Sequence, residues 1–276
     1  MLVTASANGV FEVFNKDFIS IFNASGVGRV WENLPNIPVF VWLDDIRLAI
    51  LGPIGPGAIV HCWQFDDTHA TLPFLKLVAH EDAINDIQYD KQTEFIATAS
   101  EDQTVRLWKT DKSSPYHDFK NHTAPVKAIA FQPQFEDSSP RVLASASFDG
   151  TVSLYDVTNL TVLYTIGNAI HSFPGDRISC VSWSPDGKYL TSGDLEGVVG
   201  VWEWQDSSAP RAFAIWAPDR VQEDQQESVP NGMNGHKDEL DRPVYRIHWQ
   251  KNGQSFVVCR ENRKVFISRH VKMTNG

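Results

Sequence analysis

The sequence of 276 residues is poor in cysteine and methionine, with three of each, and in long apolar runs. The cysteines at positions 62, 180 and 259 lie far apart, so no two of them have the spacing of a metal-binding motif. No apolar run approaches the roughly 18 residues that a membrane-spanning helix needs. The opening MLVTASANGVFEVF lacks the basic start of a signal peptide. These absences favour an intracellular protein with reduced thiols over a disulfide-rich secreted domain.

Positive charge is also scarce. Lysine and arginine number 24 against 34 acidic residues, which gives a formal charge of −10. This balance argues against a duplex nucleic-acid binder, which needs a basic face, and against a polybasic membrane-surface protein. A helical apolar period is missing throughout, so we expect almost no helix. The hydrophobic fraction of 42% is nevertheless sufficient for a buried core.

The sequence does contain a repeat of about 45 residues. Three clear copies read IATASEDQTVRLWKT, LASASFDGTVSLYDV and LTSGDLEGVVGVWEW, and their aromatic anchors are 47 residues apart. Two weaker copies precede them and one degenerate copy follows. The six anchor positions are Phe14, Trp63, Trp108, Tyr155, Trp202 and Ser268.

Each copy contains short segments that alternate apolar and polar residues, the two-residue period of a half-buried strand. Four such strands in about 45 residues are typical of one blade of a β-propeller. The expected fold is therefore all-β, a single propeller domain over residues 1–276 with about six blade equivalents. The expected blades cover residues 1–25, 37–79, 83–121, 125–168, 177–217 and 243–271. Residues 218–242 interrupt the rhythm as an acidic loop, for which a tolerated insertion and a partner contact are both open.

The blades resemble those of the WD-repeat family. The pairs Ala79-His80 and Asn121-His122 stand where that family has Gly-His, and SPDGKYL from Ser184 matches its usual turn. The resemblance implies a hydrogen-bonded set of histidine, serine or threonine, aspartate and tryptophan that ties a blade together. One copy offers His80, Thr98 or Ser100, Asp102 and Trp108. The next copy offers His122, Ser145 or Ser147, Asp149 and Tyr155.

In the remaining copies the set has decayed. Asn8, Gly57, Glu196 and Asn262 occupy the turn position of the aspartate, and no histidine precedes them at the expected place. We expect those blades to depend on apolar packing. The Trp-Asp dipeptide that gives the family its name survives only as Tyr155-Asp156.

A binding surface is expected on one face of the propeller, where loops surround the central channel. The residue before each turn acid should be exposed there, namely Glu101, Phe148 and Leu195, because it follows the strand directly. Exposed aromatic and aliphatic side chains beside acids suit peptide binding, although ordinary loop residues remain an alternative. The complete candidate rim is Asp82, Glu101, Thr123, Phe148, Asp176 and Leu195.

Catalytic and cofactor sites are not indicated. The histidine, serine and aspartate of one blade are already explained by the repeat, and no GxSxG motif is present. His61 and Cys62 are adjacent on an expected strand and so face opposite sides. The glycine-rich stretch 52–57 lacks the Lys-Ser/Thr of a phosphate loop. We therefore expect no enzyme activity, no metal and no cofactor.

A finer resemblance is carried by RVLASASFDGTVSLYDV and the connection QPQFEDSSP before it. Both are similar to the transducin-beta-like corepressor family of the Ebi type, in its fungal branch. The resemblance implies a nuclear, non-catalytic scaffold in a histone deacetylase complex. Corepressor subunits, deacetylase subunits and histone tails are its implied partners, with no nucleic acid, membrane or small molecule. The alternative is a WD scaffold of another assembly, in RNA processing, ubiquitin ligation or trafficking.

Departures from that family lead to an expectation about ring closure. The family has an N-terminal LisH oligomerisation segment and eight blades, whereas this sequence starts inside the second strand of a blade. We expect 22 strands, arranged as part of a seven- or eight-bladed ring. The two end blades should then be poorly sealed, because each lacks one strand.

Overall fold

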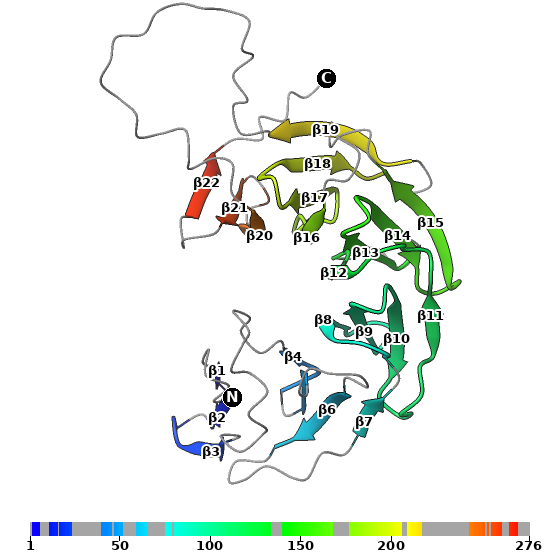
Figure 1. Ribbon diagram of the computed structural model, residues 1–276. Coiled ribbons are helices and arrows are strands. Elements are labelled where there is room, and N and C mark those ends of the chain that lie inside the picture. Colours follow the sequence, from blue (N-terminus) through cyan, green and yellow to red (C-terminus); the bar gives the residue numbers. More distant parts are fainter. Residues whose placement is uncertain are drawn as a thin grey trace, which may run out of the picture. The chain divides into compact units, whose positions relative to one another are not determined.

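The computed structural model of the chain is built from strands joined by turns and loops (Figure 1). No helix is present among the residues it describes. Those residues are 2–5, 11–15, 17–23, 40–45, 47–51, 59–65, 75–78, 80–133, 140–167, 177–205, 209–216, 243–251, 253, 255–260 and 265–269. The expected acidic loop 218–242 lies outside them.

The chain divides into two compact units, Met1–Ile129 and Ala130–Gly276. The first unit contains β1 (Leu2–Ala5), β2 (Phe11–Phe14), β3 (Ser20–Asn23), β4 (Phe40–Trp42), β5 (Arg47–Leu51), β6 (Ile59–Gln64), β7 (Leu75–Val78), β8 (Ile84–Asp90), β9 (Phe95–Ser100), β10 (Val105–Lys109) and β11 (His117–Phe119). Strand β12 (Val126–Phe131) spans the division. The second unit contains β13 (Val142–Ser147), β14 (Val152–Asp156), β15 (Thr161–Ile166), β16 (Ile178–Trp183), β17 (Tyr189–Asp194), β18 (Val199–Glu203), β19 (Arg211–Trp216), β20 (Val244–Trp249), β21 (Ser255–Arg260) and β22 (Val265–Arg269).

These strands form six antiparallel sheets in which each strand pairs with its neighbours along the chain (Figure 1). Four sheets have four strands: β4–β7, β8–β11, β12–β15 and β16–β19. The described parts of the first and last sheets, β1–β3 and β20–β22, have three strands each. The prediction of an all-β propeller built from four-stranded blades is confirmed. The exact blade boundaries stay a prediction, because several connections lie outside the described residues.

Within each unit, a described core cluster lies between two sheets that are neighbours along the chain. Strands β9, β13 and β17 are buried along their whole length. Burying one large apolar side chain contributes about 1.5–3 kcal/mol. In the first unit one cluster joins the β4–β7 and β8–β11 sheets: Leu43, Ala49, Val60, Cys62, Leu77, Ile84, Ile87, Ile96 and Trp108. In the second unit another joins the β16–β19 and β20–β22 sheets: Cys180, Tyr189, Val199, Val201, Val244, Ile247, Phe256 and Val258.

The first strand of several blades departs from the expected alternation. In β8 the buried residues are Ile84, Ile87 and Asp90, so burial recurs every third residue. A β-bulge accounts for the first of these steps, from Ile84 to Ile87, since the register between β8 and β9 shifts between Ile84 and Asp86. A bulge inserts one residue that has no partner across the strand pair, and this shifts the faces of the residues after it. The prediction of a two-residue period was therefore wrong for this strand.

The bulge residue has a role in joining blades. The Asn85 side chain donates from Nδ2 to the carbonyl of Val126, the first residue of β12, at 2.8 Å. In β16 the register shifts in the same way around Ser179, whose hydroxyl donates to the carbonyl of Val244, the first residue of β20. In two separate blades, the bulge residue thus makes a polar contact to the first strand of the following sheet.

Among the described residues, no helix is long and apolar enough to cross a membrane.

Two glycine turns offer a matched test of local packing. Gly187 and Gly253 have positive φ angles of 66° and 67°, and each amide donates to a carbonyl three residues earlier. A Cβ on Gly187 would meet the Pro133 carbonyl oxygen at 2.5 Å, whereas a Cβ on Gly253 meets nothing within 4 Å. Gly253→Ala should therefore cost about 1–2 kcal/mol for the left-handed backbone alone. Gly187→Ala should cost about 1–3 kcal/mol more, because backbone has to shift.

Urea unfolding of both variants measures this difference. Equal losses for the two substitutions would contradict the close packing of the Ser184–Gly187 turn against Pro133.

Candidate functional site

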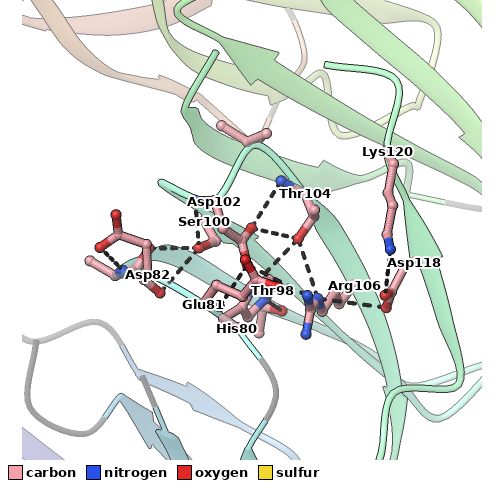
Figure 2. Close-up of polar contacts among 12 residues, drawn as sticks. His80, Glu81, Asp82, Thr98, Ser100, Asp102, Thr104, Arg106, Asp118 and Lys120 are labelled. Atoms are coloured by element: carbon pink, nitrogen blue, oxygen red, sulfur yellow. Dashed lines mark hydrogen bonds and ion pairs between the residues drawn. The ribbon is translucent and has the colours of Figure 1, made fainter. Parts of the chain in front are cut away.

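The polar centre of the β8–β11 blade is a buried chain of hydrogen bonds that starts at His80 (Figure 2). His80 precedes β8 and is 2% exposed. Its Nδ1 lies 2.7 Å from Asp102 Oδ2, and its Nε2 lies 2.7 Å from Thr98 Oγ1. Trp108 on β10 donates from Nε1 to the same Thr98 oxygen at 2.9 Å. Loop, strand and turn are therefore tied together through one imidazole.

The direction of these bonds follows from the chemistry of the groups. An ionised carboxylate only accepts, so His80 Nδ1–H donates to Asp102. With the ring neutral, Nε2 accepts from the Thr98 hydroxyl, whose oxygen in turn accepts from Trp108. The polar atoms of His80, Thr98 and Trp108 then all have hydrogen-bond partners, as buried polar groups require.

Of the two residues that the sequence left open, Thr98 contacts the histidine and Ser100 does not. Ser100 serves the turn instead. Its hydroxyl donates to the carbonyls of Asp82 and Ala83, at 3.2 and 2.9 Å, and accepts from the Asp102 amide at 3.1 Å.

Asp102 collects hydrogen bonds from several sides. Its Oδ1 accepts from the amide and the hydroxyl of Thr104, at 3.0 and 2.6 Å, and its Oδ2 accepts from the Glu81 amide at 3.0 Å. Burial raises the pKa of the Asp102 carboxyl, but the hydrogen bonds from His80 and Thr104 outweigh it. The net pKa lies well below its usual range, so the carboxylate form stabilises the fold.

Sequence reasoning missed a basic extension of this network. Arg106 on β10 is 6% exposed, and its Nη2 lies 3.6 Å from Asp102 Oδ2. On its other side Arg106 Nε lies 3.6 Å from Asp118 Oδ1, and Lys120 Nζ lies 3.7 Å from Asp118 Oδ2 (Figure 2). The pairing register sets Arg106 opposite Asp118. Opposite charges at facing positions of two expected strands were the available signal.

The β12–β15 blade keeps part of the same arrangement. Ser145 Oγ lies 3.0 Å from the Tyr155 hydroxyl, so tyrosine retains the strand-to-strand bond that tryptophan makes in the preceding blade. Asp149 again accepts from the amide and the hydroxyl of Thr151, at 2.9 and 2.6 Å, while Ser147 Oγ accepts from the Asp149 amide at 3.1 Å. His122 is 5% exposed.

The β16–β19 blade does not depend on apolar packing alone, which corrects the expectation for decayed copies. Glu196, the residue at the turn position, is exposed. Asp194, two residues earlier, is fully buried and accepts from the amides of Glu196 and Val198, at 3.0 and 2.7 Å. An aspartate at the position of Ser100 has thus taken over the turn. Alignment by turn position alone could not reveal it.

In two copies, the residue after the aromatic anchor caps the turn that follows it. The first example is the β14–β15 hairpin. Asp156 Oδ1 accepts from the amides of Thr158 and Asn159, at 2.8 and 3.0 Å. Asn15, which follows the anchor Phe14, accepts in the same way from the amides of Asp17 and Ile19, at 2.9 and 3.0 Å. The first copy therefore keeps the capping function of the family dipeptide with an amide in place of the carboxylate.

Three of the candidate rim residues are less exposed to solvent than expected. Glu101, Phe148 and Leu195 are half-buried, so the prediction that they are exposed was wrong. Neighbouring cations account for two of them: Lys127 Nζ lies 2.5 Å from Glu101 Oε1, and the Arg177 guanidinium lies 5.3 Å from the centroid of the Phe148 ring. Asp82 and Thr123 are exposed, and Asp176 lies outside the described residues.

Three residues of the second unit form what we call the Phe148 patch: Phe148, Arg177 and Leu195. Phe148 directly follows β13 and Leu195 directly follows β17, while Arg177 directly precedes β16. The Leu195 amide donates to the Arg177 carbonyl at 3.0 Å, which fixes these two segments side by side. The patch combines an aromatic ring, an aliphatic side chain and an exposed cation.

The described residues offer little reactive chemistry. No group of three or more His, Cys, Asp or Glu residues in this part of the chain is arranged to hold a metal ion. Burial raises the pKa of the Cys62 thiol, and likewise of the Cys180 thiol, to about 12, so both stay protonated near neutral pH. His80 and Thr98 are both buried and hydrogen-bonded to each other, so no substrate reaches them.

The chain matches the family model described as "WD domain, G-beta repeat" over residues 71–109, 113–156 and 167–203. Each match starts near the outer strand of one sheet and ends in the third strand of the next. Together with the antiparallel four-stranded sheets, these matches show that the chain has the WD40 propeller fold. Propellers of this class mediate protein–protein interactions and are generally non-catalytic scaffolds.

Two curated relatives are similar over about half of the chain. Pre-mRNA-processing factor 19 of Oryza sativa subsp. japonica is 28% identical over 140 residues, which are 50% of this chain and 25% of the relative. The periodic tryptophan protein 2 homolog of Dictyostelium discoideum is 31% identical over 129 residues, or 46% of this chain and 13% of the relative. The chain thus matches a quarter or less of the length of these proteins.

Solved structures are similar over nearly the whole chain. The C-terminal WD40 domain of Sif2 has a TM-score of 0.70 at 17% identity, covering 97% of this chain and 66% of that one. A chain of the mitotic checkpoint complex has a TM-score of 0.68 at 15% identity, covering 97% of this chain and 70% of that one. At these identities the likeness concerns the fold alone.

The hydrogen-bonded set can be tested by comparing two turn positions. Asp102→Ala leaves the buried donors of His80 and Thr104 without an acceptor, so it should lower the free energy of unfolding by about 1–3 kcal/mol. Glu196→Ala at the corresponding, exposed position should change it by less than about 0.5 kcal/mol. Thermal and urea unfolding give both values, and similar losses would refute the role assigned to Asp102.

The depressed pKa of Asp102 also predicts a dependence on pH. The stability contributed by the carboxylate is fully present above its unfolded-state pKa of about 3.9 and is lost as pH falls toward the lower folded-state value. Asp102→Asn cannot titrate there. The stability difference between wild type and this variant should therefore shrink as the pH is lowered from about 5 to about 3. A constant difference in urea unfolding over this range would contradict the assignment.

Proposed function

We propose that the protein is a non-catalytic, nuclear scaffold that binds protein partners in an RNA-processing assembly. The names of the relatives, among them a pre-mRNA-processing factor, support the RNA-processing assignment. The acidic net charge of −10 supports protein partners over direct contacts to nucleic-acid phosphates. RNA processing was one of the alternatives that the sequence left open.

The narrower corepressor role rests on a different observation. It depends on the resemblance of residues 141–157, and of the connection before them, to Ebi-type subunits of histone deacetylase complexes. The comparisons with known proteins lend it no support, so it is retained only as the competing outcome of the experiment below.

The observation that carries the binding proposal is the Phe148 patch. An aromatic ring held under a guanidinium is rigid, so a partner that covers it loses little additional side-chain freedom. Aromatic and arginine side chains also dominate the energetics of known interfaces. The exposed charge of Arg177 beside Phe148 and Leu195 suits a peptide that presents an apolar side chain next to a carboxylate.

The test is affinity capture of the tagged protein from its own cells, with ribonuclease present and with the recovered proteins identified by mass spectrometry. We expect RNA-processing proteins among them. Phe148→Ser should lower their recovery about tenfold or more, because loss of a central aromatic anchor costs about 2 kcal/mol. Phe18→Ser provides the control, since Phe18 is 76% exposed on the β2–β3 turn and lies outside the patch.

Three results would count against the proposal. Recovery of deacetylase and corepressor subunits instead would assign the narrower role. Unchanged recovery with Phe148→Ser would move the binding surface away from the patch. Equal losses for Phe148→Ser and Phe18→Ser would show that aromatic side chains contribute to capture non-specifically.

A further inference from the structure

The sequence contains three Ser-Pro dipeptides, at 114–115, 139–140 and 184–185. Serine followed directly by proline is the pair that proline-directed protein kinases accept as substrate. Ser139 lies outside the described residues. Ser114 and Ser184 are both followed directly by proline, but Ser114 is exposed and Ser184 is fully buried.

Ser184 is inaccessible in the folded chain. Its side chain is fully buried in the β16–β17 turn. Its hydroxyl donates to Asp186 Oδ1 at 2.5 Å and accepts from the Tyr189 amide at 2.9 Å. A kinase could reach this oxygen only after the turn has opened.

Ser114 lies in the connection between β10 and β11, within an exposed run from Asp111 to Ser114. The loop is closed at its base, where the Tyr116 amide donates to the Leu107 carbonyl at 2.7 Å. No hydrogen bond involves the Ser114 hydroxyl among the described residues. Its oxygen is therefore available without loss of a native hydrogen bond among the described residues.

The charge around this loop also favours a phosphorylated product. Lys112, two residues before Ser114, is exposed. Lys109 Nζ lies 4.8 Å from the centroid of the Tyr116 ring and 5.6 Å from that of Phe95, which holds an ammonium group at the base of the same loop. A phosphate on the loop adds about −1.5 to −2 charges, which these two cations would partly neutralise.

We propose that Ser114 is a phosphorylation site for a proline-directed protein kinase. In the reaction Ser114 Oγ forms a bond to the γ-phosphorus of ATP, the bond between that phosphorus and the β–γ bridging oxygen breaks, and ADP leaves. The hydroxyl proton passes to the base of the kinase. The proposal is independent of the partner assigned above, because it rests on the accessibility of the loop.

The test compares the folded protein with two synthetic peptides that contain Ser114-Pro115 and Ser184-Pro185. A proline-directed kinase that labels both peptides is incubated with the full chain and ATP, and phosphate is located by mass spectrometry. Ser114 in the protein should be labelled within about tenfold of the peptide rate. Ser184 should be labelled at least about a hundredfold more slowly than its peptide, because only the opened fraction reacts. Ser114→Ala should remove the label at position 114, whereas Ser113→Ala should leave it.

The opposite pattern overturns the proposal. Absence of label at Ser114 in the folded protein, while its peptide reacts, would show that the loop is not accessible to a kinase. Equal labelling of Ser184 and Ser114 would show that the reaction follows unfolding. Because Ser114 is exposed and its hydroxyl makes no hydrogen bond among the described residues, the thermal midpoint of Ser114→Ala should match that of wild type, which excludes misfolding as the cause of lost label.

Discussion

The hydrogen bond between His80 and Asp102 is the interaction on which the β8–β11 blade depends. It is made in buried surroundings, since Thr98 and Trp108 beside it are fully buried. In such surroundings an unpaired polar group costs more than a paired one contributes. His80 stabilises the blade because its ring bonds two polar side chains, those of Asp102 and Thr98. Asp102 contributes further because its carboxylate also accepts hydrogen bonds from Thr104 in the turn that it closes. Arg106 and Asp118 extend this arrangement to the outer strand.

Two other blades make the corresponding strand and turn contacts with different residues. A tyrosine hydroxyl replaces the indole in the β12–β15 blade, and a buried aspartate closes the turn in the β16–β19 blade. The side chains of the bulge residues Asn85 and Ser179 donate hydrogen bonds to the first carbonyl of the strand that begins the following sheet. Loops that leave this framework carry the surface chemistry: the Phe148 patch offers a partner contact, and the loop at Ser114 offers a modifiable hydroxyl. A rigid β framework that presents variable loops is what a scaffold protein requires.

Much of the fold could be predicted from the sequence, because the aromatic anchors recur at a regular interval and each strand carries its own pattern. The residue types of the His80 set were recognisable for the same reason, but the choice between Thr98 and Ser100 was not, since both lie on the same strand two residues apart. The bulge at Asn85 escaped prediction because it depends on pairing with β9. The partial burial of Glu101 and Phe148 could not be predicted, because Lys127 and Arg177, which contact them, come from other strands or loops.

A double-mutant cycle on Thr98 and Asp102 tests the central claim most directly. These two side chains do not bond each other, and both bond the His80 ring. Free energies of unfolding would be measured for wild type, Thr98→Val, Asp102→Asn and the double variant. If the chain through His80 acts as one unit, the two losses should differ from additivity by about 0.5–3 kcal/mol. Additive losses, within about 0.3–0.5 kcal/mol, would contradict it and would make the two bonds independent.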